Sequence, residues 1–134
     1  MKLLLGEIRP MMEALNVVMD KEIPAKTAYW LSKALKELGS EFEAMEKARQ
    51  TLVNKYAKKD DEDQLIVEDN QYVMEDMAAF NAEFIELAEQ EIEIKYKPIS
   101  VDQLGDIQIK GTDLFKLGKL IKDDEEEENE PYVV

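Results

Sequence analysis

The chain of 134 residues contains neither cysteine nor histidine. The lack of cysteine excludes disulfides, thiolate nucleophiles and zinc–sulfur sites, and nothing then argues for an oxidising compartment. The lack of histidine excludes the common serine triad and imidazole metal sites, and it removes the usual proton shuttle near neutral pH. Most hydrolase designs are thereby ruled out. We predict a protein that is not an enzyme, that uses no cofactor, and that has no catalytic, cofactor-binding or metal-binding residue.

Long apolar runs and an excess of basic residues are also missing. No segment approaches the roughly 20 apolar residues that span a bilayer, and the opening MKLLLGEIRPMM is interrupted by Glu7 and Pro10, unlike a signal peptide. The 17 basic residues face 31 acidic ones, which gives a net charge of −14. This field repels nucleic-acid phosphates and attracts basic surfaces. We expect no membrane association, no direct nucleic-acid binding, and a protein partner with a basic surface.

The glycine–lysine pair in GTDLFKLGKL does not form a phosphate-binding loop. Gly118 lies seven positions after Gly111, where the motif requires five, and Leu120 replaces the hydroxyl residue that would hold the metal. The stretch is typical of a helix that contains a glycine.

The acidic loop of residues 60–71, DDEDQLIVEDNQ, departs from the EF-hand pattern. Leu65 stands where a glycine must turn the chain, and Gln71 stands where a bidentate glutamate is required. Pairs of carboxylates can act as acid and base in a desolvated pocket, but most of the acidic residues here follow exposed patterns. Weak cation binding by this loop is left open by the sequence.

One stretch carries a long helical repeat. Its seam positions are alternately three and four residues apart, and a single arginine breaks their apolar character. This repeat predicts one helix of about residues 25–58, about 50 Å long, packed nearly parallel or antiparallel to a partner. The seam positions are Ala28, Leu31, Leu35, Leu38, Phe42, Met45, Arg49, Leu52 and Tyr56.

A shorter helix, up to about Gln90, is expected to fold back along the C-terminal half of the long one. Its Met77, Phe80, Phe84 and Leu87 repeat the spacing of three and four residues. Asp76 or Glu75 marks its start, and the loop before it contains a predicted hairpin turn at residues 68–70.

The N-terminal half of the long helix is then left without a partner. A first helix of about residues 10–19 or a small sheet could cover it. A second copy of the chain could also do so, which would make a homodimer through Leu31, Leu35 and Leu38.

Residues 92–96 and 107–109 have the alternation of β-strands, and the short apolar run at residues 2–5 predicts a buried strand. We expect them to form a small sheet at the open end of the helical hairpin. Thr112 is predicted to cap a last helix, DLFKLGKLI, which carries its leucines on one face. The fold class that follows is α+β and mostly helical, with a long helix, an antiparallel helical partner and a small β-sheet at one end. Residues 1–121 form one predicted domain.

Residues 122–134 form a predicted acidic tail, which is expected to be disordered because it cannot bury apolar surface. The tail has two interpretations: it keeps the protein soluble, or it attracts a basic surface of a partner electrostatically. Trp30, beside the long seam, also has two interpretations. It is a partner-binding anchor if it is exposed, or it only covers the edge of the core. The candidate partner-binding residues are Trp30, Asp123, Asp124, Glu125, Glu126, Glu127, Glu128 and Glu130.

In the segments DMAAFNAEFIELAEQEIEI and ISVDQLGDIQIKGTDLFKLGKLI, the chain resembles a family of small uncharacterised proteins of tailed phages and prophages of Gram-positive bacteria. The likeness lies in the order of a long helix, an acidic loop, an FN-E---L helix, an EI-I strand and short leucine-bearing helices. It covers most of residues 1–121, and the acidic end departs from it. The resemblance implies a virus-encoded accessory protein and carries over no functional residue.

Two functions from different classes follow. The first is a non-enzymatic phage accessory protein that binds a host or defence protein in the host cytoplasm, with acidic mimicry of nucleic acid as the mechanism. The second is a structural or assembly component of the virion, in which the helical seam and apolar edges join neighbouring copies. We favour the first, because the charge of the chain is its most unusual property.

Overall fold

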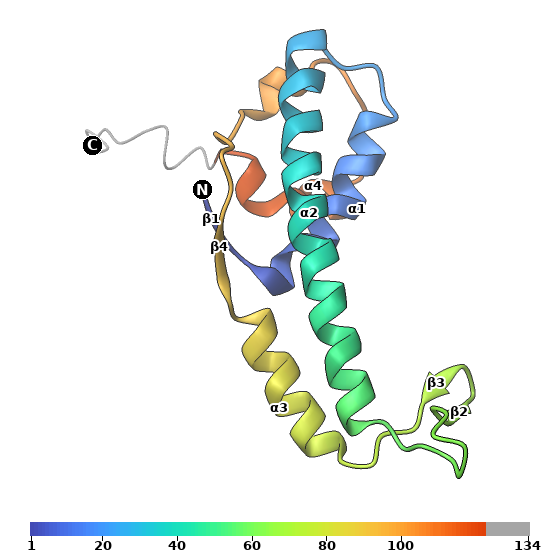
Figure 1. The fold of residues 1–134 in the computed structure, drawn as a ribbon. Coiled ribbons are helices and arrows are strands. Elements are labelled where there is room, and N and C mark those ends of the chain that lie inside the picture. Colours follow the sequence, from blue (N-terminus) through green and yellow to red (C-terminus); the bar gives the residue numbers. More distant parts are fainter. Residues whose placement is uncertain (123–134) are drawn as a thin grey trace, which may run out of the picture.

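The computed structural model describes residues 1–122 and is built along one long helix (Figure 1). This helix, α2 (Ala25–Tyr56), has 32 residues and is therefore about 48 Å long. Pro24 precedes it, where the missing N–H of proline costs no hydrogen bond. Ala57 takes an extended conformation and ends it. The predicted long helix is confirmed.

The other elements are short and follow the predicted order closely. They are β1 (Lys2–Leu4), the 3-10 turn η1 (Leu5–Glu7), α1 (Ile8–Met19), β2 (Val67–Glu68), β3 (Gln71–Tyr72), α3 (Met77–Ala88), β4 (Glu91–Glu93), η2 (Val101–Leu104), α4 (Gly111–Leu117) and η3 (Gly118–Leu120). A mostly helical α+β fold is thus confirmed.

The N-terminal half of α2 is covered by α1, and α4 packs against α1 in turn. These helices, the first strand pair and the segment after it form what we call the head of the molecule (Figure 1). The core of the head is apolar, and its fully buried large side chains are Leu3, Ile8, Leu15, Val18, Leu31, Leu38, Ile94, Leu104, Leu117 and Leu120. The first helix therefore supplies the cover that the unmatched half of the long helix required.

The first helix begins at Ile8, two residues earlier than predicted. Pro10 consequently occupies the first turn instead of the first position, which is still a place where an unpaired N–H is normal. Ile8 is completely buried, so its contribution to the core favours helical structure from this residue onward.

The first and fourth strands pair antiparallel, with Leu3 opposite Ile92. Met1 and Ile94 exchange two further bonds of 2.9 Å, which extend this small sheet at its end. The predicted third strand, residues 107–109, is wrong: no strand forms there among the described residues. Gly105, at a φ of 81°, turns the chain beside Pro24, and the segment then packs its half-buried Ile107 and Ile109 on the core.

The predicted cap of the last helix is also corrected. The helix begins at Gly111 with Lys110 before it, so Thr112 lies inside the helix and is not its cap. The helix ends at Leu117, because Gly118 takes a φ of 52° and opens a separate 3-10 turn. Leu117 and Leu120 nevertheless point into the core as the spacing predicted.

The buried line of the long helix differs from the predicted seam. Its buried residues are Thr27, Leu31, Ala34, Leu38, Met45 and Val53, whereas the seam residues Ala28, Leu35, Phe42, Arg49, Leu52 and Tyr56 are half-buried. A straight helix has 3.6 residues per turn and drifts about 20° per heptad away from a 3.5-residue seam. The drift is compatible with packing here because the helix meets different partners along its two halves.

The C-terminal half of α2 and the antiparallel α3 form an arm that extends away from the head (Figure 1). Asp76 caps α3 as predicted, accepting a hydrogen bond of 3.0 Å from the Ala79 amide. Phe80 and Phe84 stack with their ring centroids 6.0 Å apart. No residue of α3 is buried, so the helix is held by one face alone.

Candidate functional site

Trp30 lies on the outer face of the long helix and is 43% exposed, as the anchor reading requires. Its ring meets that of Tyr29 edge-on, with centroids 5.4 Å apart. The Lys33 Nζ lies 5.2 Å from the Trp30 ring centroid and 5.5 Å from that of Tyr29. The three side chains form a small exposed patch that combines aromatic surface with one positive charge.

The other predicted partner-binding residues belong to the acidic tail. Asp123, Asp124, Glu125, Glu126, Glu127, Glu128 and Glu130 lie outside the described residues.

The distal end of the arm carries a second acidic segment, which we call the distal cap (residues 57–76). The Lys58 amide donates to the Val73 carbonyl at 2.7 Å, and the Lys58 carbonyl accepts from the Ile66 amide at 2.9 Å. The Val73 amide donates in turn to the Ile66 carbonyl at 3.0 Å. Three extended stretches are thus tied together, and the Glu75 amide joins the last of them to the end of the long helix through the Tyr56 carbonyl at 2.8 Å.

The turn at the tip of the distal cap confirms the predicted hairpin. Asp69 and Asn70 take φ values of 52° and 63°, which are the positive angles of the tight turns that suit two-residue hairpins. Val67 pairs with Tyr72 across the strands, and these side chains are 55% and 39% exposed. The distal cap therefore presents an apolar pair at its surface.

The charge of the distal cap is strongly negative. It contains two lysines and eight acidic residues, and all ten side chains are exposed. Among the ion pairs of residues 1–122, the one within the distal cap joins Lys59 to Asp63 at 3.9 Å. The acidic residues are Asp60, Asp61, Glu62, Asp63, Glu68, Asp69, Glu75 and Asp76.

In the acidic loop at residues 60–71, the first carboxylate is hydrogen-bonded to the backbone of the loop. The Asp60 Oδ1 accepts hydrogen bonds from the amides of Glu62 at 2.9 Å and Gln64 at 3.0 Å. Within residues 1–122, no three acidic side chains converge in a way that could hold a metal ion. The carboxylates of the loop thus fix its shape and present charge outward.

A cluster of polar side chains joins the two helices below the distal cap. The Lys55 Nζ lies 3.2 Å from the Glu83 Oε2. Hydrogen bonding to Tyr56 and then to Glu83 raises the pKa of Lys55, and hydrogen bonding to Tyr56 and then to Lys55 lowers the pKa of Glu83. Both directions favour the charged pair, whose Lys55 and Glu83 side chains are 56% and 38% exposed.

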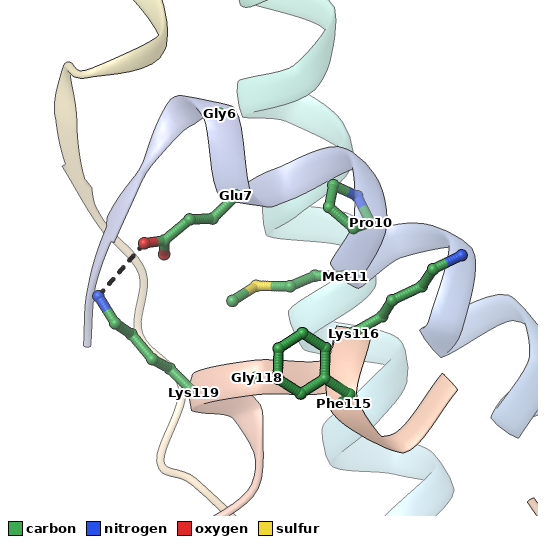
Figure 2. Close-up of a pocket in the computed structure, with 8 residues that line it drawn as sticks. All are labelled: Gly6, Glu7, Pro10, Met11, Phe115, Lys116, Gly118 and Lys119. Carbon is green, nitrogen blue, oxygen red and sulfur yellow. Dashed lines mark ion pairs between the residues drawn. The ribbon is translucent and has the colours of Figure 1, made fainter. Parts of the chain in front are cut away.

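A hollow of about 400 Å³ lies between the first and last helices of the head (Figure 2). We call it the α1–α4 hollow. Its lining is mainly apolar, with Met11 and Phe115 facing one another in Figure 2. The residues around it are Gly6, Glu7, Pro10, Met11, Phe115, Lys116, Gly118 and Lys119.

Two ion pairs flank the α1–α4 hollow. The Lys119 Nζ lies 3.5 Å from the Glu7 Oε1, and the Lys116 Nζ lies 3.8 Å from the Glu13 Oε2. The other oxygen of Glu7, Oε2, is buried and has no hydrogen-bond partner in the described part of the chain. Phe115, at 86% exposure, has the most exposed large apolar side chain of residues 1–122.

A second hollow, of about 570 Å³, lies where the arm meets the head. Both arginines of the chain, Arg9 and Arg49, line it beside Phe42 and Phe84. Arg49 donates to Glu46 through Nε and Nη2, with the shortest contact at 3.1 Å. Neither hollow was predicted from the sequence, because their residues come from separate elements that only the fold brings together.

Comparisons of the chain with protein-family models, with curated proteins and with solved structures found no match. None of the helices in residues 1–122 combines the length and the apolar character needed to cross a membrane.

Proposed function

We propose that this protein is a non-enzymatic recognition factor that binds a protein with a basic surface. The distal cap is the contact, and its carboxylates occupy a surface that otherwise receives nucleic-acid phosphates. Following the resemblance in the sequence, the protein is a phage-type accessory factor that acts in the host cytoplasm on a host or defence protein.

The proposal depends chiefly on the form of the distal cap. Eight exposed carboxylates are carried by a hydrogen-bonded segment at the end of a long helical arm. Charges held on an ordered scaffold lose little conformational entropy when they bind, whereas charges on an unstructured chain lose more. A phosphate backbone likewise presents closely spaced negative charges along a stiff path. The distal cap therefore offers a basic groove an ordered acidic surface.

The exposed apolar pair in the distal cap supports protein recognition over plain solubilisation. Val67 and Tyr72 lie opposite each other in the strand pair that is further from the turn, and Glu68, Asp69 and Gln71 lie between them in the sequence. Protein interfaces commonly combine an apolar or aromatic centre with a polar rim. A segment that only kept the chain soluble would need no such pair.

Trp30 belongs to a different surface. It precedes Tyr56 by 26 residues along α2, which corresponds to about 39 Å of helix. A partner that covers the distal cap would therefore have to extend along most of the arm to reach it. We retain Trp30 as a separate candidate contact, and we expect residues 123–134 to add their negative charge to the long-range field.

The test compares two variants that lose the same number of charges. D61N/E62Q/E68Q/D69N neutralises the distal cap and spares the structural carboxylates of Asp60 and Asp76. D20N/E22Q/E86Q/D106N neutralises four exposed acids elsewhere. Each immobilised protein is incubated with host lysate at about 50 mM and about 200 mM salt, and the captured proteins are identified and then purified.

We expect the wild type and the second variant to retain a nucleic-acid-handling protein at low salt and to lose it at high salt. The variant of the distal cap should lose it at both. The purified partner should be displaced from DNA by the wild type, and removal of residues 123–134 should lower the association rate. Capture that is indifferent to salt and to the distal cap would contradict the proposal.

The alternative function is a component of the virion. Mass spectrometry of purified particles separates the two: a stoichiometric amount of the chain in particles would replace our proposal, and its absence would remove the alternative.

A further inference from the structure

The α1–α4 hollow combines an open apolar cavity with an exposed aromatic ring beside it (Figure 2). Leaving a phenylalanine side chain in water instead of burying it costs about 1.5–3 kcal/mol. Phe115 is nevertheless 86% exposed, although Leu114 and Leu117 on the same helix pack on or within the core. Such a ring next to a hollow indicates a surface that another molecule covers.

The charge around the α1–α4 hollow identifies the occupant. The chain as a whole carries −14, so two copies repel each other over most of their surface. Around the hollow, in contrast, Glu7 and Glu13 are paired with Lys116 and Lys119, and the Arg9 Nε also lies 3.6 Å from the Glu13 Oε1. With three basic and two acidic groups, this patch would not attract a basic protein and would attract a nucleic acid only weakly. A second copy of the chain would meet it without repulsion and with matching groups of both signs.

We propose that two copies of this chain associate through the α1–α4 hollow, with Phe115 of each copy inserted into the hollow of the other. The inference goes beyond the proposed function, because it uses a surface in the head and not the distal cap.

A two-fold symmetric contact requires one patch that is complementary to itself. The α1–α4 hollow meets this requirement, since it presents a projecting ring and a cavity side by side. Gly118 keeps a side chain out of the cavity, since a Cβ there would lie 3.4 Å from the terminal methyl of Met11. Met11 offers a flexible thioether that can adapt to an aromatic ring.

This contact differs from the homodimer through Leu31, Leu35 and Leu38 that the sequence left open. Leu31 and Leu38 are already buried within one chain, at 1% and 0% exposure, because the first helix covers them. They have no surface left for a second copy. The proposed contact between copies therefore lies at the α1–α4 hollow and not along the long helix.

The first experiment measures the mass of the full chain by sedimentation equilibrium over a range of concentrations. We expect a concentration-dependent dimer. Phe115→Ser should raise the dissociation constant at least about 100-fold, because each dimer buries two rings. The matched control is Ile85→Ser, which removes an apolar side chain of 53% exposure from α3 and should leave the dissociation constant unchanged. Circular dichroism confirms that both variants keep their helices.

The second experiment tests the contact between chains. Glu13→Lys gives each patch an excess of positive charge, and Lys116→Glu gives it an excess of negative charge. Each variant alone should be monomeric at concentrations where the wild type is dimeric. An equimolar mixture should form a heterodimer, since the two patches now attract each other.

Three results would overturn the inference: a wild type that remains monomeric up to about 1 mM, a dimer that Phe115→Ser leaves intact, or charge variants that fail to associate when mixed. The variant D61N/E62Q/E68Q/D69N should dimerise like the wild type, so failure of one proposal is distinguishable from failure of the other.

Discussion

The hydroxyl of Tyr96 donates a hydrogen bond of 3.1 Å to the carbonyl of Leu120, 24 residues further along the chain. Tyr96 is only 5% exposed, and the same carbonyl accepts a second bond of 3.1 Å from the Ile99 amide. This buried link joins the segment after the fourth strand to the last turn of the head, next to the helix that carries Phe115.

The stability of the fold should depend on Tyr96 at alkaline pH. Burial raises the pKa of Tyr96 to about 12, from about 10 in an unfolded chain. The folded state therefore binds the hydroxyl proton of Tyr96 more tightly than the unfolded state does. The contribution of the protonated Tyr96 to the stability of the fold is complete below pH 10 and is lost as the pH rises from 10 to 12. We expect the free energy of unfolding to fall by about 1.4 kcal/mol per pH unit in that window. Urea denaturation at several pH values measures it.

The matched variant is Tyr96→Phe. It should cost about 1 kcal/mol at pH 7, because the Leu120 carbonyl loses one of two hydrogen bonds, and it should show a weaker loss of stability between pH 10 and 12. Equal alkaline slopes for the two proteins would show that other groups cause the dependence.

Thr27→Val should destabilise the protein by about 1–3 kcal/mol. Thr27 is 6% exposed, and its hydroxyl donates to the Gln103 carbonyl at 2.6 Å, which ties the start of the long helix to the turn before Gly105. Valine fills the same volume but leaves that carbonyl without this donor. Ser32→Ala is the control, since the Ser32 hydroxyl is exposed and bonds only to its own helix. Thermal unfolding compares the two.

Leu38→Ala should cost about 2–5 kcal/mol, and Leu35→Ala should cost clearly less. Leu38 is completely buried, whereas Leu35 is half-buried, although the two hold adjacent positions in the heptad seam. Chemical denaturation gives both values. Equal losses would mean that the helix buries its heptad seam after all.

Asn70→Gly should stabilise the distal cap. Asn70 has a φ of 63°, an angle that glycine adopts without steric cost, and the preceding Asp69 makes the pair Asp-Gly that favours this hairpin. We expect amide exchange at Ile66 and Val73 to slow by about two- to five-fold, which corresponds to about 0.4–1 kcal/mol.

The control for this variant is Asn81→Gly, at an exposed position inside α3. Glycine in a helix interior costs about 1 kcal/mol relative to alanine, so exchange in α3 should become faster. Faster exchange at Val73 in the Asn70 variant would contradict the turn geometry.

The elements of this fold were predictable wherever a local signal was strong. The spacing of apolar residues gave the long helix, and Asp76 gave the start of the return helix. The errors occurred where two local signals competed. The segment at 107–109 alternates like a strand, yet Gly105 directs it onto the core, and Thr112 resembles a cap, yet the helix starts before it.

The candidate surfaces were predictable to a smaller extent. Trp30 is exposed, and the acidic character of residues 60–76 is evident from composition. The α1–α4 hollow is different, since Gly6 and Met11 are about a hundred residues from Phe115 and Lys119. Periodicity describes one element at a time and therefore contains no information on which elements meet.

The sequence by itself determined the helices, their order, the net charge and the lack of histidine and cysteine chemistry, because these depend on local spacing and composition. Only the tertiary structure decided which side of α2 is buried, how the acidic loop is held as a hydrogen-bonded cap, and why Phe115 lies beside an open hollow. Those features arise from contacts between distant segments, whose energies depend on the packing of the whole chain.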